Sequence, residues 1–377
     1  MNKVISFFKK ELMLTVSIIA AAASLFISPP DISLLTSIDW HTLATLFMML
    51  TVLEGFKKEN IFAPIIKLSS GVEQMRSLSF FLIFGVFFSS MFVTNDVSLI
   101  IFVPLTILLF RGGGKEKYIL PVISMENIAA VRGSMLTPFG SPQNLYLFNK
   151  SGVSAWKFMF HMLPLWVFSA LLLCVFICFL YRKEPKERIS VAVTPDTEDG
   201  KPRKKIMYLI LFAFVIFEIV SRTKYWYIVL IAVVLAVLIF DIKILLKTDY
   251  VLILTFLCFF VFSASIVKNS AVSGFLSRTV TGREYISGIL LSQVISNVPA
   301  AIVLYRFTEN LPALLYGVDS AGLCTLIGSL ASVINYRIYV KEYPGKGKDF
   351  IKTFTKWSLC FFAVVVIPGY LLSFWRY

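Results

Sequence analysis

The sequence predicts an all-α polytopic membrane protein built from inverted-topology repeats, with two re-entrant helical hairpins and two broken transmembrane helices. Hydrophobic residues make up 58% of the 377 residues and charged residues only 15%, against roughly 45–50% and 25% in soluble domains. The mean hydropathy is +0.81. Apolar runs of about 17–25 residues, enough to cross a bilayer, recur along the chain. Two apolar runs are interrupted by polar triplets, Thr94-Asn95-Asp96 and Ser296-Asn297-Val298.

Each polar triplet lies near the middle of its apolar run. Lipid offers no hydrogen bonds, so Asn, Ser and Thr at bilayer depth are costly unless they pair or bind a solute. A triplet between two half-length apolar arms therefore predicts a helical hairpin whose tip lies inside the membrane, at residues 78–110 and 283–310. Ser90 and Ser292 precede the two triplets at the same distance. Matched interruptions in two halves are typical of secondary transporters built from repeats.

Nine membrane-crossing segments, two of them broken, follow from the apolar runs. We expect them at 12–28, 40–56, 118–150, 156–181, 206–221, 224–240, 249–266, 319–340 and 352–376. The broken segments are 118–150 and 319–340. The first segment follows three lysines, as the apolar core of a signal peptide would. No small-x-small cleavage site comes directly after it, so we predict an uncleaved helix.

The segments group into five parts. They are an N-terminal transmembrane helix and loop (1–39), a first repeat (40–181), a cytoplasmic linker (182–205), two scaffold helices (206–248) and a second repeat (249–377). The linker is rich in charge and contains three prolines and a glycine, which favours a solvated loop.

The distribution of lysine and arginine predicts the orientation. With a cytoplasmic N-terminus, 26 of these residues fall in cytoplasmic segments and nine outside, as the positive-inside rule requires. The net charge of +14 is scattered between apolar runs and so does not indicate nucleic-acid binding. We expect a multi-pass protein of the cell membrane (inner or plasma membrane). The same orientation makes the two hairpins enter from opposite faces, as inverted repeats require.

The broken segments supply the candidate binding chemistry. Thr137 to Asn144 contains two prolines that remove amide donors and Gly140, which permits unusual dihedral angles. Thr325 to Ser329 is its counterpart. Freed carbonyls and helix C-termini favour Na⁺, and helix N-termini favour anions. The candidate substrate- or cation-binding residues are Ser90, Thr94, Asn95, Asp96, Arg132, Thr137, Gly140, Ser141, Asn144, Ser292, Ser296, Asn297, Asp319, Thr325, Gly328 and Ser329.

Three charged residues in apolar surroundings have alternative interpretations. Arg132 could bind a substrate carboxylate with two hydrogen bonds, take the place of a bound cation, or pair with Asp96, Glu126 or Asp319. Asp96 and Asp319 are candidates for cation or proton coupling. For Asp319, a helix cap at the membrane surface is an equal alternative.

The segment Thr137-Pro138-Phe139-Gly140-Ser141-Pro142-Gln143-Asn144 resembles the Thr-Pro-x-Gly-x-Pro-x-Asn signature of the ion transporter superfamily. That group includes citrate-transporter-like permeases, arsenite permeases, divalent-anion:sodium symporters and related sodium–proton antiporters. The two triplets resemble its Ser-Asn-Thr hairpin tips, and the first is nearest the arsenite-permease variant. The resemblance extends from about Asp39 to the end of the chain.

The resemblance implies two inverted repeats, a transport domain that moves past a scaffold as an elevator, and a homodimer. It places Asn95 and Gly140 at one Na⁺ site, and Asn297 and Gly328 at the other. The sequence departs from the family where the second triplet ends in Val298. It also has Val131-Arg132-Gly133-Ser134 where relatives carry Asn-Ile-Gly-Gly.

The predicted function is secondary active transport of a small anion, a di- or tricarboxylate or an oxyanion, coupled to Na⁺ or H⁺. The alternatives on the same fold are a sodium–proton antiporter, and an arsenite efflux permease, which Arg132 disfavours because arsenite is neutral. An enzyme is not expected, since no His-Glu-x-x-His or Gly-x-Ser-x-Gly motif occurs. The expected partners are the small anion, membrane lipids and a second copy of the chain, with no cofactor besides the coupling ion.

Overall fold

The computed structural model describes residues 11–29, 31–61, 64, 72–184, 186–189, 201–221 and 225–375, with backbone only for residues 12, 13, 27 and 33. Over these ranges the chain is helical and forms no β-strand, apart from one isolated bridge between Gln74 and Arg188. Much of the predicted linker and the three N-terminal lysines lie outside the described residues.

The helices are α2 Leu12–Ile27, α3 Ile32–Ser37, α4 Trp40–Lys58, α6 Met75–Val93, α7 Asn95–Gly112, η1 Glu116–Tyr118, α8 Ile119–Ser134, α9 Pro142–Ser151, α10 Ala155–Leu180, α11 Pro202–Ser221, α12 Trp226–Asp241, η2 Ile242–Ile244, α13 Tyr250–Lys268, α14 Ser270–Val280, α15 Glu284–Ile295, α16 Asn297–Tyr305, α17 Leu311–Ala321, α18 Leu330–Glu342 and α19 Gly347–Leu372. Within the described ranges, six helical stretches are long and apolar enough to cross a membrane: α6, α7, α10, Trp226–Ile244, α13 and α19. The all-helical membrane architecture predicted from composition is confirmed.

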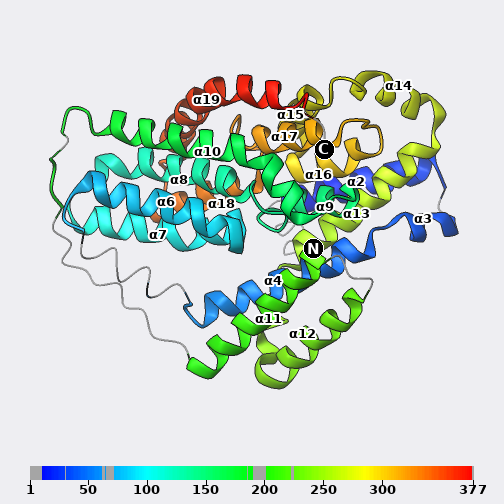
Figure 1. Ribbon diagram of the computed structural model, residues 1–377, viewed down its shortest axis with the longest axis horizontal. Helices are drawn as coiled ribbons and strands as arrows, with labels where there is room; N and C mark the ends of the chain where they lie inside the picture. The colour runs from blue at the N-terminus through cyan, green and yellow to red at the C-terminus, as the bar shows by residue number, and fades with distance from the viewer. Residues whose placement is uncertain are drawn as a thin grey trace.

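Outward faces of these helices are apolar, which fits contact with lipid. On α10, Leu171, Val175 and Phe179 recur at intervals of four residues and are more than half exposed. A water-soluble protein rarely exposes contiguous apolar patches of this kind. In Figure 1, α6, α7, α8, α10 and α18 lie together at the left, while α4, α11 and α12 form a separate layer below.

Both predicted helix interruptions are present, with nearly identical backbones. Thr94 joins α6 to α7 with φ 70° and ψ 157°, and Ser296 joins α15 to α16 with φ 72° and ψ 158°. Elsewhere in the described chain, only Asn60 among non-glycine residues has a positive φ. Such a conformation costs a residue with a Cβ about 1–3 kcal/mol, so the surrounding structure must hold it.

The hairpin boundaries differ from the prediction. The first hairpin runs from Met75 to Gly112 rather than over 78–110, and its arms of 19 and 18 residues are each long enough to cross a membrane. Half-length arms were therefore a wrong expectation here. The second hairpin has arms of 12 and 9 residues and ends at Tyr305, short of the predicted 310. Apolar periodicity does not mark the ends of a helix, because caps and packing decide them.

The second broken segment also begins earlier than predicted. α17 starts at Leu311 instead of 319, because the side chain of Asn310 accepts a hydrogen bond from the Ala313 amide at 3.2 Å and Pro312 occupies the first turn. The chain then leaves helix over 322–329 before α18 begins. The short helices α3 and α14 were not predicted. Asp31 and Asn269 cap their first turns.

The two hairpins pack in corresponding ways on the broken helices. The first arms, α6 and α15, lie against α8 and α17 of their own halves. The second arms pack on both halves: α7 on α8 and α18, and α16 on α17 and α9. Each hairpin therefore contacts both broken helices.

Candidate functional site

The tip of the first hairpin is bonded mainly to its own helix. Asn95 is almost fully buried, and its Oδ1 accepts a hydrogen bond from the Asp96 amide at 2.9 Å. The carbonyl of Thr94 accepts from the Ser98 hydroxyl at 3.0 Å. The buried Oδ1 of Asp96 accepts no hydrogen bond from any described residue. Thr137 of the broken segment donates to the carbonyl of Met91, which fastens the segment to the hairpin arm.

The tip of the second hairpin is bonded to the broken segment beside it. The amide of Asn297 donates to the carbonyl of Gly328 at 3.2 Å. Gln293 donates to the carbonyl of Ala321 at 3.1 Å and accepts from the Thr325 hydroxyl at 2.7 Å. The Nδ2 of Asn297 has no acceptor within the described chain.

Sequence reasoning missed Gln293, which holds this tip. It lies four residues before Asn297, at the position that Met91 occupies relative to Asn95. The available signal was that Gln293 is polar and lies in an apolar run, whereas the corresponding residue of the first half, Met91, is apolar.

Close backbone approach explains the two aligned glycines. A Cβ atom on Gly140 would lie 2.2 Å from the carbonyl oxygen of Ser134, and one on Gly328 would lie 2.4 Å from that of Ala321. Neither glycine has a positive φ, so the expectation of unusual dihedral angles at Gly140 is wrong. Glycine is required because the chain turns back onto the carbonyls that end the preceding helix. The following residues, Ser141 and Ser329, also share one extended conformation.

Arg132 lies fully buried on α8 and reaches the end of α17. Its Nη1 donates to the main-chain carbonyl of Asp319 at 3.3 Å. Its Nε and Nη2 have no acceptor among the described residues. Of the three alternatives for Arg132, the ion pair with Asp96, Glu126 or Asp319 is not formed in that part of the chain. Arg132 bonds the main chain of Asp319, not its carboxylate.

The carboxylate of Asp319 is bound by the first turn of α9. Gln143 donates to its Oδ1 at 3.1 Å. The amide nitrogen of Asn144, turned toward the carboxylate, lies 3.0 and 3.1 Å from its two oxygens. Asp319 is 1% exposed and lies inside α17, so the alternative of a surface helix cap is wrong. The positive end of the α9 dipole favours a negative charge at this place.

A small cavity of about 80 Å³ adjoins the first tip. Thr94 and Asp96 line it from the tip, Glu54 and Lys57 from α4, and Asp249 from the start of α13. Lys57 pairs with Glu54 at 2.9 Å. The cavity therefore carries more acidic than basic groups.

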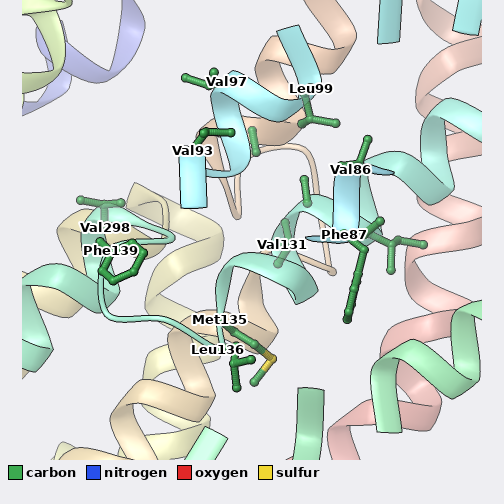
Figure 2. Close-up of a cluster of buried hydrophobic side chains, with 14 of the residues drawn as sticks. Val86, Phe87, Val93, Val97, Leu99, Val131, Met135, Leu136, Phe139 and Val298 are labelled. Carbon is green, nitrogen blue, oxygen red and sulfur yellow. The ribbon is translucent and has the colours of Figure 1, made fainter. Parts of the chain in front are cut away.

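The remaining candidate residues are the serines of the two hairpins. Ser90 donates to the carbonyl of Phe87 at 3.0 Å, and Ser292 to that of Gly288 at 2.6 Å, so both hydroxyls serve their own helices. The hydroxyl of Ser296 has no partner within the described ranges. Figure 2 shows one buried apolar cluster to which both tips contribute, through Val97 and Val298. Val298, where the sequence departs from the family, therefore contributes an apolar side chain to this cluster and supplies no side-chain oxygen to a cation.

The sequence is similar to that of known membrane transporters. The family model described as citrate transporter matches residues 4–328. The chain is 30% identical over 303 residues to an uncharacterized transporter, MJ0456, of Methanocaldococcus jannaschii, covering 80% of this chain and 81% of that protein. It is 32% identical over 309 residues to the inner membrane protein YbiR of Escherichia coli, covering 80% of each.

A solved structure, that of the YdaH transporter of Alcanivorax borkumensis, aligns with 97% of this chain and 96% of its own, at a TM-score of 0.48 and 13% identity. The family match extends over most of the chain, and the relatives include a protein named as a transporter and one named as an inner membrane protein. The chain is therefore a member of the citrate transporter family, an integral membrane transporter and not an enzyme.

Proposed function

We propose that this transporter carries a small anion, a carboxylate or an oxyanion, in secondary active transport coupled to Na⁺ or H⁺. The observation that carries the proposal is the buried guanidinium of Arg132, of which Nε and Nη2 have no acceptor in the described chain. These two nitrogens form one edge of the planar group. Their parallel N–H bonds match the two oxygens of a carboxylate or a similar oxyanion.

The position of Arg132 supports a substrate role over a purely structural one. Arg132 lies in the last turn of α8, beside the break, and an arginine inside the membrane costs about 2.5–3.5 kcal/mol on insertion scales. Its single described hydrogen bond, to the Asp319 carbonyl, leaves two donor nitrogens of the guanidinium without an acceptor in the described chain. An anion bound at the free edge would neutralise the charge and satisfy both donors. The bond to a carbonyl at the end of α17 also fits the alternative in which Arg132 takes the place of a cation.

The coupling ions have plausible ligands in the two interrupted regions. Asn95 with Gly140, and Asn297 with Gly328, would provide amide and main-chain oxygens to Na⁺, a hard cation. The matched dihedral angles of Thr94 and Ser296 support a relation between the halves by inverted repetition. The separate layer of α4, α11 and α12 is a suitable scaffold for an elevator movement, in a homodimer, of the part that holds both hairpins.

Uptake into proteoliposomes tests the proposal. A panel of carboxylates and oxyanions is offered to the wild-type protein and to Arg132→Lys, with Arg306→Lys as a matched control. Arg306 lies near the surface and bonds Ser263 at 3.1 Å. We expect Arg132→Lys to raise the half-saturating anion concentration about tenfold or more, because a lysine cannot form the paired bonds. Arg306→Lys should behave as the wild type. An unchanged anion affinity in Arg132→Lys would remove the substrate role.

The acidic cavity at the first tip favours a second candidate, a sodium–proton antiporter. Asp96, Glu54 and Asp249 line it together with one lysine. An antiporter moves Na⁺ against an imposed pH gradient when no anion is present, whereas the anion carrier does not. The same vesicles, loaded without any candidate substrate, distinguish the two functions.

A further inference from the structure

A fully buried polar layer lies where α7, α8 and α18 pack on one another, apart from the candidate site described above. These helices are neighbours in the left part of the molecule (Figure 1). The layer consists of Thr106 of α7, Glu126 and Asn127 of α8, and Ser332 and Asn335 of α18, all with no exposed surface.

Two amide groups tie α8 to α18 through their nitrogen atoms. Asn127 donates from Nδ2 to the hydroxyl of Ser332 at 3.1 Å. Asn335 donates from Nδ2 to the carbonyl of Ile123 at 2.7 Å. Both nitrogens therefore have acceptors, whereas the side-chain oxygens of both amides have no hydrogen-bond donor among the described residues.

Every unpartnered atom in the layer is an acceptor oxygen. Oδ1 of Asn127, Oδ1 of Asn335 and Oε2 of Glu126 accept no hydrogen bond from the described residues. The other carboxylate oxygen of Glu126 accepts from the hydroxyl of Thr106. A buried acceptor without a partner costs about 1–3 kcal/mol, so a ligand that carries positive charge would stabilise a layer with three of them.

Helix geometry places these three side chains on neighbouring turns of α8 and α18. In an α-helix the carbonyl of residue 123 points toward the amide of residue 127. The side-chain amide of Asn335, bonded to that carbonyl, therefore lies beside the turn that carries Glu126 and Asn127. Helical side chains also lean toward the N-terminus, which directs Glu126 back over the same turn.

We propose that this layer binds a hard monovalent cation, with Na⁺ as the best match, through Glu126, Asn127 and Asn335. Carboxylate and amide oxygens are ligands of hard cations. A single carboxylate balances one positive charge, whereas a divalent ion would leave a net charge in a buried environment. Three cations of these helices have partners outside the layer: Arg111 of α7 pairs with Glu342 of α18 at 3.2 Å, Arg337 of α18 pairs with Glu11 at 3.8 Å, and Arg132 of α8 bonds Asp319.

The site is separate from the anion site proposed at Arg132 and from the Na⁺ ligands proposed at the hairpin tips. α8 is the first segment of one broken helix and α18 the second segment of the other. A cation held between them would stabilise the contact between the two halves. The proposal thus goes beyond the proposed function and does not depend on it.

Thermal unfolding of the purified protein tests the site. Melting is measured in NaCl, LiCl, KCl and choline chloride at equal ionic strength, over a range of Na⁺ concentrations, because a ligand that binds the folded state raises the Tm by mass action. We expect Na⁺ to raise the Tm over choline. Glu126→Gln and Asn335→Leu should each weaken the apparent Na⁺ affinity by about tenfold or more. Asn149→Leu is the matched control, since Asn149 bonds Thr42 between α9 and α4 at 3.1 Å.

The other outcomes separate this proposal from its neighbours. A Na⁺ response whose size and apparent affinity are unchanged in both Glu126→Gln and Asn335→Leu, or no effect of any alkali cation on the wild type, would overturn it. A response of the wild type to pH but not to Na⁺ would instead assign a proton to Glu126, and the cation site would be wrong. Where a variant does not fold, binding of radioactive sodium to Asn127→Leu replaces it. Arg132→Lys should keep the Na⁺ response even if it loses the anion, so failure of the proposed function leaves this test intact.

Discussion

The two hairpins share one backbone conformation at their tips and use it differently. The first has long arms, and its tip carries Asp96 toward a cavity that α4 and α13 also line. The second has short arms, and its neutral tip is held to the broken segment by Asn297 and Gln293. The two tips therefore share the same main-chain break. The side chains around each break decide whether the tip faces a cavity or packs against the neighbouring broken segment.

The largest effect is expected at the glycines that both halves share. Gly140→Ala and Gly328→Ala would each place a methyl group against a carbonyl oxygen of the backbone, which has no flexible end to move. Such overpacking costs about 1–3 kcal/mol. We expect a lower Tm and loss of transport in both variants, measured by thermal unfolding and vesicle uptake.

The control for the glycine variants is Gly274→Ala in α14, where an added Cβ meets no atom within 4 Å. Alanine there should stabilise the helix by up to about 1 kcal/mol. If Gly328→Ala is as harmless as the control while Gly140→Ala is not, close backbone packing at the glycine is required only in the first half.

The asparagines test the tips themselves. Asn95→Ala and Asn297→Ala should each abolish uptake, because the proposed coupling ion loses a ligand in each. Only Asn95→Ala should also lower stability, by about 1 kcal/mol, since the Asn95 side chain accepts a bond from the first turn of α7. Normal uptake by either variant would exclude that asparagine from the site. Equal stability losses would contradict the difference between the tips.

The smallest effect is expected for Gln293→Met, which gives the second tip the residue found in the first. The carbonyl of Ala321 keeps the Cys324 amide as a donor at 3.1 Å, and the hydroxyl of Thr325 is exposed to solvent, so the cost should stay below about 1 kcal/mol. Hydrogen exchange should then quicken at α15 and α16 and not at α6 and α7. Unchanged exchange would mean that the Asn297–Gly328 bond alone holds this tip.

Much of the fold could be predicted because a segment that lies in the membrane must have an apolar local sequence. Apolar runs predict helices, since lipid forces each segment to satisfy its own hydrogen bonds. The triplets at Thr94 and Ser296 predict the breaks for the same reason. Helix ends were less accurate: the start of α17 depends on Asn310 and Pro312, and the long arms of the first hairpin on packing against α8 and α18.

The sequence by itself determined the long apolar helices, the two positions where polar triplets interrupt them, and that a buried Arg132 requires a binding partner. Only the tertiary structure decided that Arg132 bonds the main chain of Asp319, that Gln143 and Asn144 bind its carboxylate, and that Asn127 and Asn335 join α8 to α18. The physical reason is range. Helix formation and polar cost act over neighbouring residues, whereas these contacts join positions about 180 to 210 residues apart, whose register is set when the second arm of each hairpin packs on the other half.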